Sequence, residues 1–579
     1  MMRLLAASLA YKRISTKIRE EIMMHLQTKK TVHGLMAAAI FFTAFLFAGC
    51  AGPETIEIPT FCENYRAHVE ILSADEMEGR APATPGGERA KQYIKGEFQR
   101  IGLKPALEDT YFQPVPLVEI TGYNFSDLTI AGGSEEMSFT YLDDMVIGTY
   151  RLQDYSKLEN SELIFVGYGV VAPEYDWDDY EGLDVEGKTV VVLVNDPGFI
   201  LEDEDLFNGR AMTYYGRWTY KFEEAARQGA AGALIIHQTE PASYGWDVVR
   251  NSWSGTQYGI GEDGGQPRLE AEGWIQKQVA RELFESIGMD LEEVLASAVK
   301  PDFKAFSMGL YANVGFNNTF QYSDCHNVIG YIEGSEYPDE TIVYMGHWDH
   351  LGMVETEDGV DIYNGAVDNG TGVGALLSIA ERFMTQDEQP RRSIVFMAVT
   401  AEESGLLGSR FYGENPVFPL ATTVGGINID ALNVYGPTWD VSVVGYGNSE
   451  MEDYLRRHTE AQGRYLVPEP TPEAGYFYRS DHISLARQGV PMIYAQGGTD
   501  YIGRDAAYAE RVAQDMASRY HAPTDVIHDK WVWDGMHQDM WLFYELGKEL
   551  ANSDDFPNWY EGNEFRQLRD KSAEKRRKQ

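Results

Sequence analysis

Short apolar runs alternate with a helical pattern in the second half of the chain. Runs of strand length occupy residues 341–346, 393–399, 424–429 and 490–495. Between the first two, residues 371–386 repeat apolar side chains at the spacing of an amphipathic helix. Strands that alternate with helices predict an α/β fold, in which a mixed central sheet is flanked by helices on both faces.

Residues 136–305 have a strand pattern of their own. Residues 161–171 and 187–196 read as buried strands, and residues 220–238 read as a helix, a glycine-rich turn and a strand. The segment lacks the histidine and carboxylate pattern described below. We therefore interpret it as an inserted module, mainly β in structure.

The beginning and the end of the chain complete this division. Helical spacing occurs at residues 62–72 and 88–101, and the Gly- and Pro-rich stretch at 79–88 between them predicts a loop. We divide the chain into an export segment (1–50), the first part of the main domain (51–135), the inserted module (136–305), the main domain (306–560) and a charged tail (561–579). Within this tail, the basic run at 571–579 is expected to be solvated.

The N-terminal segment has the pattern of an export signal. Lys29 and Lys30 precede an apolar run, Leu35 to Gly49, which is too short for a comfortable membrane span and is followed by Cys50. A start at Met23 or Met24 gives a conventional signal. The sequence FAGC resembles the lipobox of bacterial lipoproteins and predicts lipidation at Cys50, although a cleaved signal or a retained anchor stays open. A lipoprotein would lie in the bacterial cell envelope, anchored by lipid and facing the periplasm or the exterior.

Composition narrows the possible partners. The formal net charge of −42 argues against nucleic acid, which needs a basic surface. The hydrophobic content of 44% is ample for packed cores and argues against global disorder. Beyond Cys50 the remaining cysteines are Cys62 and Cys325. Export permits a disulfide between them, but two unrelated thiols are an equally good reading.

Histidine and carboxylate side chains follow the predicted strands of the main domain. Each type alone is more commonly a structural or surface residue, but together they recur at the strand exits of one sheet, where α/β proteins collect their functional groups. Imidazole and carboxylate ligands without a thiolate suit catalytic zinc. The residues are His347 and Asp349, Asp368, Glu402 and Glu403, Asp430, and His521.

The motifs that carry these residues resemble a known family. The string GHWDH…GAVDNGTG…TAEESGLLGS…NIDAL…YHAPTD is similar to the co-catalytic zinc aminopeptidases of peptidase family twenty-eight, whose relatives include glutamate carboxypeptidase, the transferrin receptor and glutaminyl cyclases. The resemblance extends over residues 72–105, 327–335 and 479–491, and residues 140–300 resemble a protease-associated domain. It implies the phosphorylase/hydrolase-like fold of zinc exopeptidases.

The resemblance also implies a role for each residue at the strand exits. It assigns five ligands to two zinc ions: His347 and Asp430 to one, Glu403 and His521 to the other, and Asp368 to both. Asp349 would accept a hydrogen bond from His347 and fix its tautomer. Glu402 would be the general base that takes a proton from the attacking water and delivers it to the leaving amine. A cis peptide bond is implied between Asp368 and Asn369.

Other polar residues near these motifs have weaker claims. His350 follows the first ligand motif and fits loop structure better than a site role. Tyr478, Arg479 and His482 are candidate substrate-binding residues. Ser480, Asp481 and His482 do not form a catalytic triad, because three consecutive residues cannot surround one hydroxyl as a triad requires.

We expect from these features a zinc aminopeptidase that acts on peptide substrates. A carboxypeptidase or dipeptidase, and a glutaminyl cyclase, are alternatives on the same fold. A non-catalytic binding protein is a further alternative, which predicts lost ligands, and none is lost. Substrate preference, the role of the module and the oligomeric state are left open. The native metal is open too, because manganese or cobalt suits the same ligands.

Overall fold

The computed structural model describes residues 57–576 except 204, 262–265 and 357–358. The predicted export segment, with Cys50, lies outside the described residues. Within them, no helix combines the length and the apolar character that crossing a bilayer would require. Cys62 and Cys325 are both free thiols, so the structure contains no disulfide between them.

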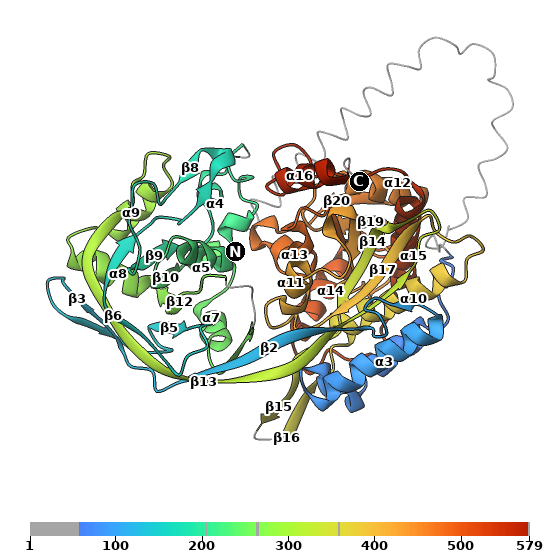
Figure 1. The fold of residues 1–579 in the computed structure, drawn as a ribbon, viewed down its shortest axis with the longest axis horizontal. Coiled ribbons are helices and arrows are strands. Elements are labelled where there is room, and N and C mark those ends of the chain that lie inside the picture. The colour runs from blue at the N-terminus through green and yellow to red at the C-terminus, as the bar shows by residue number, and fades with distance from the viewer. Residues whose placement is uncertain (1–56, 204, 262–265, 357–358, 577–579) are drawn as a thin grey trace, which may run out of the picture. The chain divides into compact units, whose positions relative to one another are not determined.

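A mixed sheet forms the centre of the main domain (Figure 1). Its strands are β13 (Phe306–Ile332), β14 (Tyr337–His347), β17 (Arg392–Val399), β18 (Thr423–Asn428), β19 (Asp440–Val443), β20 (Tyr465–Pro468) and β21 (Met492–Gly497). They pair in the order β13–β17–β14–β18–β21–β19–β20. The pairs β17–β14, β14–β18, β18–β21 and β19–β20 are parallel, whereas β13–β17 and β21–β19 are antiparallel.

Helices cover both faces of this sheet, as the sequence predicts. Because side chains alternate along a strand, Ile342 and Tyr344 of β14 enter one core cluster and Val343 and Met345 enter another. The first cluster includes residues of α2 (Tyr65–Leu72), α3 (Pro85–Ile101), α10 (Gly372–Met384) and α15 (Asp534–Asn552). The second includes residues of α11 (Leu407–Glu414) and α13 (His482–Ala486).

The start of α3 differs from the prediction. The helix begins at Pro85 and not at Glu88, and a helical turn, η1 (Asp75–Arg80), precedes it where the prediction has the beginning of a loop. The side chain of Thr84 accepts a hydrogen bond from the Gly87 amide at 3.2 Å. A threonine cap followed by proline at the first helical position is a favourable helix start, which outweighs the loop signal of the glycines and prolines.

The middle of the chain contains a second sheet with its own core. Its strands pair in the order β6–β9–β10–β12–β5, and all pairs but the last are parallel. Helices pack on it, including α5, α8 and α9, so this region is α/β and not mainly β as predicted. The elements are β3 (Leu128–Ala131), β4 (Met137–Phe139), β5 (Met145–Gly148), β6 (Tyr155–Phe165), β7 (Val171–Ala172), β8 (Trp177–Asp178), β9 (Thr189–Leu193), α4 (Gly198–Leu201), α5 (Trp218–Arg227), β10 (Gly232–His237), α6 (Thr239–Ala242), α7 (Trp246–Ser252), β11 (Thr256–Ile260), β12 (Ala271–Gln276), α8 (Lys277–Ser286) and α9 (Leu291–Ala298).

One long strand joins the two sheets. Strand β13 pairs with β6 over residues 306–317, with β2 (Phe112–Tyr123) over residues 317–328, and with β17 over residues 328–332. Figure 1 shows β2 and β13 running side by side from one sheet to the other. The inserted segment is therefore connected through continuous β-structure and not through a flexible linker.

The C-terminal segment is more ordered than a solvated tail. Residues Arg566–Arg576 form α16, and Arg569 on this helix is 2% exposed. Its guanidinium donates to the carbonyls of Thr423 and Val424 at 2.7 and 2.6 Å. Within the basic run 571–579, which we predict to be solvated, Arg576 donates to the Ala421 carbonyl at 2.7 Å.

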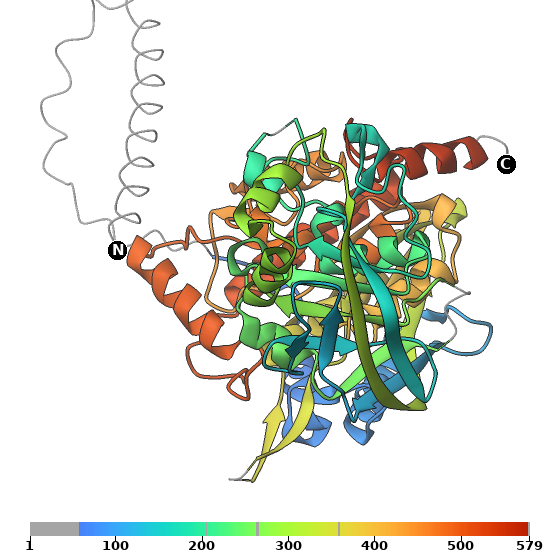
Figure 2. The same ribbon diagram turned by 90° about the vertical axis from the view of Figure 1, so that its left-hand side faces the viewer.

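Two further elements lie beside the predicted site. Helix α14 (Ala506–Arg519) is exposed along most of its length, with Val512 as its one buried residue, and stands out in Figure 2. A hairpin of β15 (Gly352–Thr356) and β16 (Gly359–Tyr363) projects from the loop after β14.

Away from these two elements, helix α12 (Met451–Ala461) packs against α15.

Candidate active site

Three parallel strands bring the predicted residues to one edge of the central sheet. His347 is the last residue of β14, Glu402 and Glu403 lie in the turn after β17, and Asp430 follows β18 by two residues. The carboxyl ends of parallel neighbours lie at the same edge, so these side chains converge. Ala401, Ala431 and His521 have positive φ angles of 53°, 60° and 54°. Such backbone conformations are costly for residues other than glycine and cluster at functional sites.

Asp368 approaches from the turn before α10. The turn, η4 (Ala366–Thr371), contains a cis peptide bond between Asp368 and Asn369, as expected. The side chain of Asn369 donates to the Ile429 carbonyl at 2.9 Å and accepts from the Ala431 amide at 3.1 Å. Asn369 therefore joins the turn that carries Asp368 to the loop that carries Asp430.

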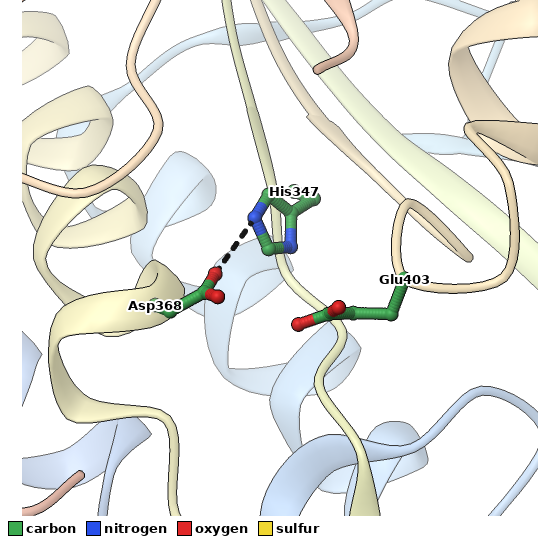
Figure 3. Close-up of side chains that lie close together, drawn as sticks. All are labelled: His347, Asp368 and Glu403. Atoms are coloured by element: carbon green, nitrogen blue, oxygen red, sulfur yellow. Dashed lines mark ion pairs between the residues drawn. The ribbon is translucent and has the colours of Figure 1, made fainter. Parts of the chain in front are cut away.

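The two histidines lie on opposite oxygens of Asp368. His347 Nε2 is 3.2 Å from Asp368 Oδ1 and 3.2 Å from Asp430 Oδ1. His521 Nε2 is 3.3 Å from Asp368 Oδ2 and 3.0 Å from Glu403 Oε2. Figure 3 shows His347, Asp368 and Glu403 directed toward a common space. The five predicted ligands thus form two groups that share Asp368.

Two neighbouring contacts differ from expectation. His347 Nδ1 lies 3.2 Å from the main-chain carbonyl of Asp349 but 3.9 Å from its carboxylate, so the backbone oxygen is the one that orients the ring. The Asp349 carboxylate instead accepts from the Glu402 amide at 3.2 Å. His350, predicted as loop structure, is buried with Nδ1 2.6 Å from Glu403 Oε1. It contacts a predicted ligand directly.

The electrostatics of the site fit a bound cation. Burial alone would lower the pKa of both histidines, but the surrounding carboxylates raise the pKa of His347 well above its usual value and that of His521 to about 10. Asp349 Oδ2 and both carboxylate oxygens of Asp481 are buried and have no hydrogen-bond partner among the residues that the structure describes. Burial and neighbouring charges raise the pKa of Glu402 well above its usual value. A site that draws protons this strongly is one where metal ions with neutral histidine ligands would relieve the repulsion.

Arg80, which the sequence does not single out, binds backbone carbonyls of the segments that carry the site residues. Its side chain is 1% exposed and donates to four carbonyls. The acceptors are Leu72 at 2.5 Å, Asn364 at 2.6 Å, Gly365 at 2.9 Å and Trp348 at 2.9 Å. One buried cation therefore ties the residue after His347 to the segment that leads into the Asp368 turn. In the sequence, Arg80 lies in the stretch EGRAPATPGG, which predicts a loop and does not indicate that the arginine binds these carbonyls.

Asp525 and Ser480 are two further supports that the sequence reasoning missed. Asp525 ends the motif YHAPTD and accepts from the amides of Val367 and Asp368 at 3.0 and 3.1 Å. Ser480 Oγ donates to Asp430 Oδ2 at 2.5 Å. Both residues lie inside motifs that resemble the peptidase family, and this position was the only indication of a role in the sequence. The role itself follows from the hydrogen bonds that the structure shows.

The three predicted substrate residues have different environments. Tyr478 is 8% exposed and donates to Glu564 at 2.8 Å. His482 is fully buried, and burial lowers its pKa to about 3, so the ring is neutral. Of the three, only Arg479 is exposed. Burial therefore leaves Arg479 as the one of the three that is available to a ligand.

Comparison with known proteins gives one family match and several partial relatives. Residues 327–545 match Peptidase family M28. Aminopeptidase NAALADL1 of Mus musculus is 33% identical over 131 residues, which are 22% of this chain and 16% of that protein. Probable glutamate carboxypeptidase AMP1 of Arabidopsis thaliana is 25% identical over 451 residues, which are 71% of this chain and 58% of that protein. The chain thus spans less than two thirds of the length of these relatives.

Among solved structures, an aminopeptidase from Aneurinibacillus sp. strain AM-1 is similar with a TM-score of 0.46 and 18% identity, covering 85% of this chain and 95% of that one. The family match is the more specific finding, because its bounds enclose the whole constellation of site residues. Residues 327–545, which carry all five predicted metal ligands together with Asp349 and Glu402, are thus similar to peptidase family M28.

Proposed function

We propose that the protein is a zinc-dependent exopeptidase that removes amino acids from the N-termini of peptides. The observation that carries the proposal is the convergence of five imidazole and carboxylate ligands in two groups that share Asp368. The family match supports a peptidase, and the exopeptidase specificity is our inference from it.

Two zinc ions are proposed as the cofactor. His347 and Asp430 would hold one ion, Glu403 and His521 the other, and Asp368 both. When bound, such a pair lowers the pKa of a water molecule and polarises the carbonyl of the scissile bond. Binding would need both rings unprotonated, so it would release the protons that the surrounding carboxylates favour on His347 and His521.

Glu402 is the proposed general base. It lies with His347 and Asp430 in one group of side chains whose ligand atoms are all within 4.8 Å of one another. Its carboxylate would take a proton from the attacking water and pass it to the nitrogen of the leaving amine. A carboxylate whose pKa is raised by burial is better suited to accept and return a proton near neutral pH than an exposed one.

The remaining parts of the proposal concern location and the middle of the chain. We propose that Cys50 is lipidated and that the protein is anchored to a bacterial membrane by this lipid. We propose also that the segment 136–305 is a protease-associated domain. A carboxypeptidase or dipeptidase, or a cyclase, is the alternative activity for the same ligands, since the choice depends on where the substrate termini are held.

The test uses purified protein stripped of metal and reconstituted with zinc, beside Glu402→Gln and the exposed control Glu414→Gln. Bound zinc is counted, and aminoacyl-anilides are compared with the same peptides carrying blocked N-termini. We expect about two zinc ions per chain, cleavage of free N-termini only, and near-complete loss in Glu402→Gln with zinc retained. Cleavage of blocked peptides would exclude an aminopeptidase, and one zinc or none would exclude the two-ion site.

A further inference from the structure

Strand β13 has an open edge where it runs between the two sheets. Its outer side pairs with β6 as far as Asn317 and with β17 from Val328 onward. Between these two residues its inner side pairs with β2, and no strand of the described residues pairs with its outer side. Figure 1 shows β13 as the outer of the two strands along this stretch. An open edge of this kind offers its backbone groups to a further strand.

Backbone hydrogen bonds show which residues of the stretch face outward. The Asn318 amide donates to the Asp154 carbonyl at 2.9 Å, and the His326 carbonyl accepts from the Trp348 indole at 3.1 Å. Backbone groups point to alternate sides along a strand, so every second residue between these two directs its amide and its carbonyl away from β2. No described residue bonds to these outward groups. They belong to Phe320, Tyr322 and Asp324.

The features that usually protect an edge strand are missing from this stretch. Natural edges carry lysine, proline or a bulge that prevents pairing with another chain. Residues 305–323 contain no charged side chain and no proline, although charged residues make up 24% of the protein. The register with β2 continues from Asn317 to Val328 without a bulge. Phe320 and Tyr322 are 37% and 59% exposed, so the edge also presents apolar surface that suits contact with protein.

The same edge of a second copy fits this one in length. Asn318 and His326, whose outward groups already have partners, lie four residues before and four residues after Tyr322. The open stretch is therefore symmetric about Tyr322. Two such edges can pair as antiparallel strands around a two-fold axis at this residue, and the backbone groups that are already bonded then lie at the ends of the paired stretch.

The side chains of the two edges are also compatible. On the face that carries Phe320 and Tyr322, the axis would place Tyr322 opposite its counterpart and diagonal to the second phenylalanine. Aromatic pairs in these positions stabilise neighbouring strands. Asp324 would lie opposite a phenylalanine and not opposite a second carboxylate, so the pairing brings no like charges face to face.

We propose that the outer edge of β13 from Phe320 to Asp324 pairs with the same edge of a second copy and forms a symmetric dimer. The proposal goes beyond the proposed peptidase function and does not rest on it. Because both copies use the same edge, the assembly closes at two chains. Each copy has a formal net charge of −42, so salt should strengthen the association by screening the repulsion between them.

Sedimentation velocity of the zinc-loaded protein, over a micromolar range of concentration and in low and high salt, measures the association. Tyr322→Pro removes an outward amide and leaves the bonds to β2 in place, since proline is tolerated on the solvent side of an edge strand. Tyr322→Lys and Tyr322→Glu each place two like charges across the axis. Tyr123→Lys is the matched control, because this tyrosine of β2 is 44% exposed and lies opposite Asn317, outside the open stretch.

We expect a monomer–dimer equilibrium for the wild type and for Tyr123→Lys, with more dimer in high salt. Each substitution of Tyr322 should raise the dissociation constant about tenfold or more. The midpoint of thermal unfolding, the zinc content and kcat/KM per chain should stay unchanged. A mixture of Tyr322→Lys and Tyr322→Glu should restore the association, because the opposite charges meet only if this residue lies on the axis.

A wild type that stays monomeric at high micromolar concentration in high salt would overturn the proposal and leave an extended segment of another protein as the occupant of the edge. A dimer that persists in all three Tyr322 variants would place the interface elsewhere. If the wild type dimerises but the mixed charge variants do not, the pairing centred on Tyr322 is wrong. None of these outcomes depends on zinc binding or peptide cleavage, so the test is separate from that of the proposed function.

Discussion

Asp525 offers a sharp test of how the second layer of the site supports its ligands. The carboxylate is 3% exposed and accepts the amides of Val367 and Asp368, the two residues that carry the shared carboxylate into the site. Asp525→Ala removes both acceptors while the main-chain bond from Ala366 to the Asp525 carbonyl, at 3.1 Å, remains. Two N–H groups then have no partner in a place that water reaches poorly.

The expected cost follows from these two groups. A buried donor left without a partner costs about 1–3 kcal/mol. Burial raises the pKa of Asp525, which means that part of this cost is recovered when the buried carboxylate is removed. We therefore expect the free energy of unfolding of the metal-free protein to fall by about 2–4 kcal/mol. Zinc affinity should fall about 10–100-fold, as is typical when outer partners of a ligand are removed.

Urea unfolding after metal removal measures the first quantity, and competition with a chromophoric chelator measures the second. Asp525→Asn keeps one acceptor oxygen and should lose about half as much stability. Asp505→Ala is the matched control, because this exposed aspartate caps α14 by accepting from the Tyr508 amide outside the site. Unchanged zinc affinity in a folded Asp525→Ala protein would refute the idea that this carboxylate positions Asp368.

Further predictions concern pH and the thiols. Burial raises the pKa of Glu272, which is 7% exposed, from about 4.5 to about 8. The folded state then binds the proton more tightly than the unfolded state, so this contribution to stability is complete below about pH 4.5 and is lost as the pH rises to about 8. Between pH 5 and pH 8.5, the free energy of unfolding of Glu272→Gln should fall less than that of the wild type. Urea titrations at each pH measure this difference, and an unchanged pH profile would contradict the assignment. Cys62 and Cys325 should both titrate as free thiols in denaturant, with no mass change on reduction. Their raised pKa values predict slow alkylation in the native protein, and a disulfide-linked peptide in a digest would contradict this.

The local pattern of the sequence predicted the main elements well, because strand and helix periods are short-range properties. The runs at 341–346 and 393–399 became β14 and β17, and the helical spacing at 371–386 became α10. The inserted segment was harder, since its buried strands gave a clear signal while the helices on its faces did not change the β interpretation. The basic run at 571–579 was predicted to be solvated, because composition does not reveal that the Ala421 carbonyl accepts a hydrogen bond from Arg576.

For the site, the sequence supplied the residue types and their order along the chain. His347, Glu403 and Asp430 each follow a strand, and the parallel register of β14, β17 and β18 turns that order into proximity. What the sequence could not supply was every contact that depends on chain segments far apart. Arg80 lies 284 residues from Asn364 and Asp525 lies 158 residues from Val367, and no periodicity encodes such contacts.

The sequence by itself therefore determined the α/β architecture of the main domain and the residue types of the candidate ligand set. Both follow from residue type and spacing, which act over a few residues. Only the tertiary structure decided that His347 is oriented by the Asp349 backbone and that His350 contacts Glu403. Those outcomes depend on how separate segments pack, because burial and distance between charges are properties of the assembled fold and not of any local stretch.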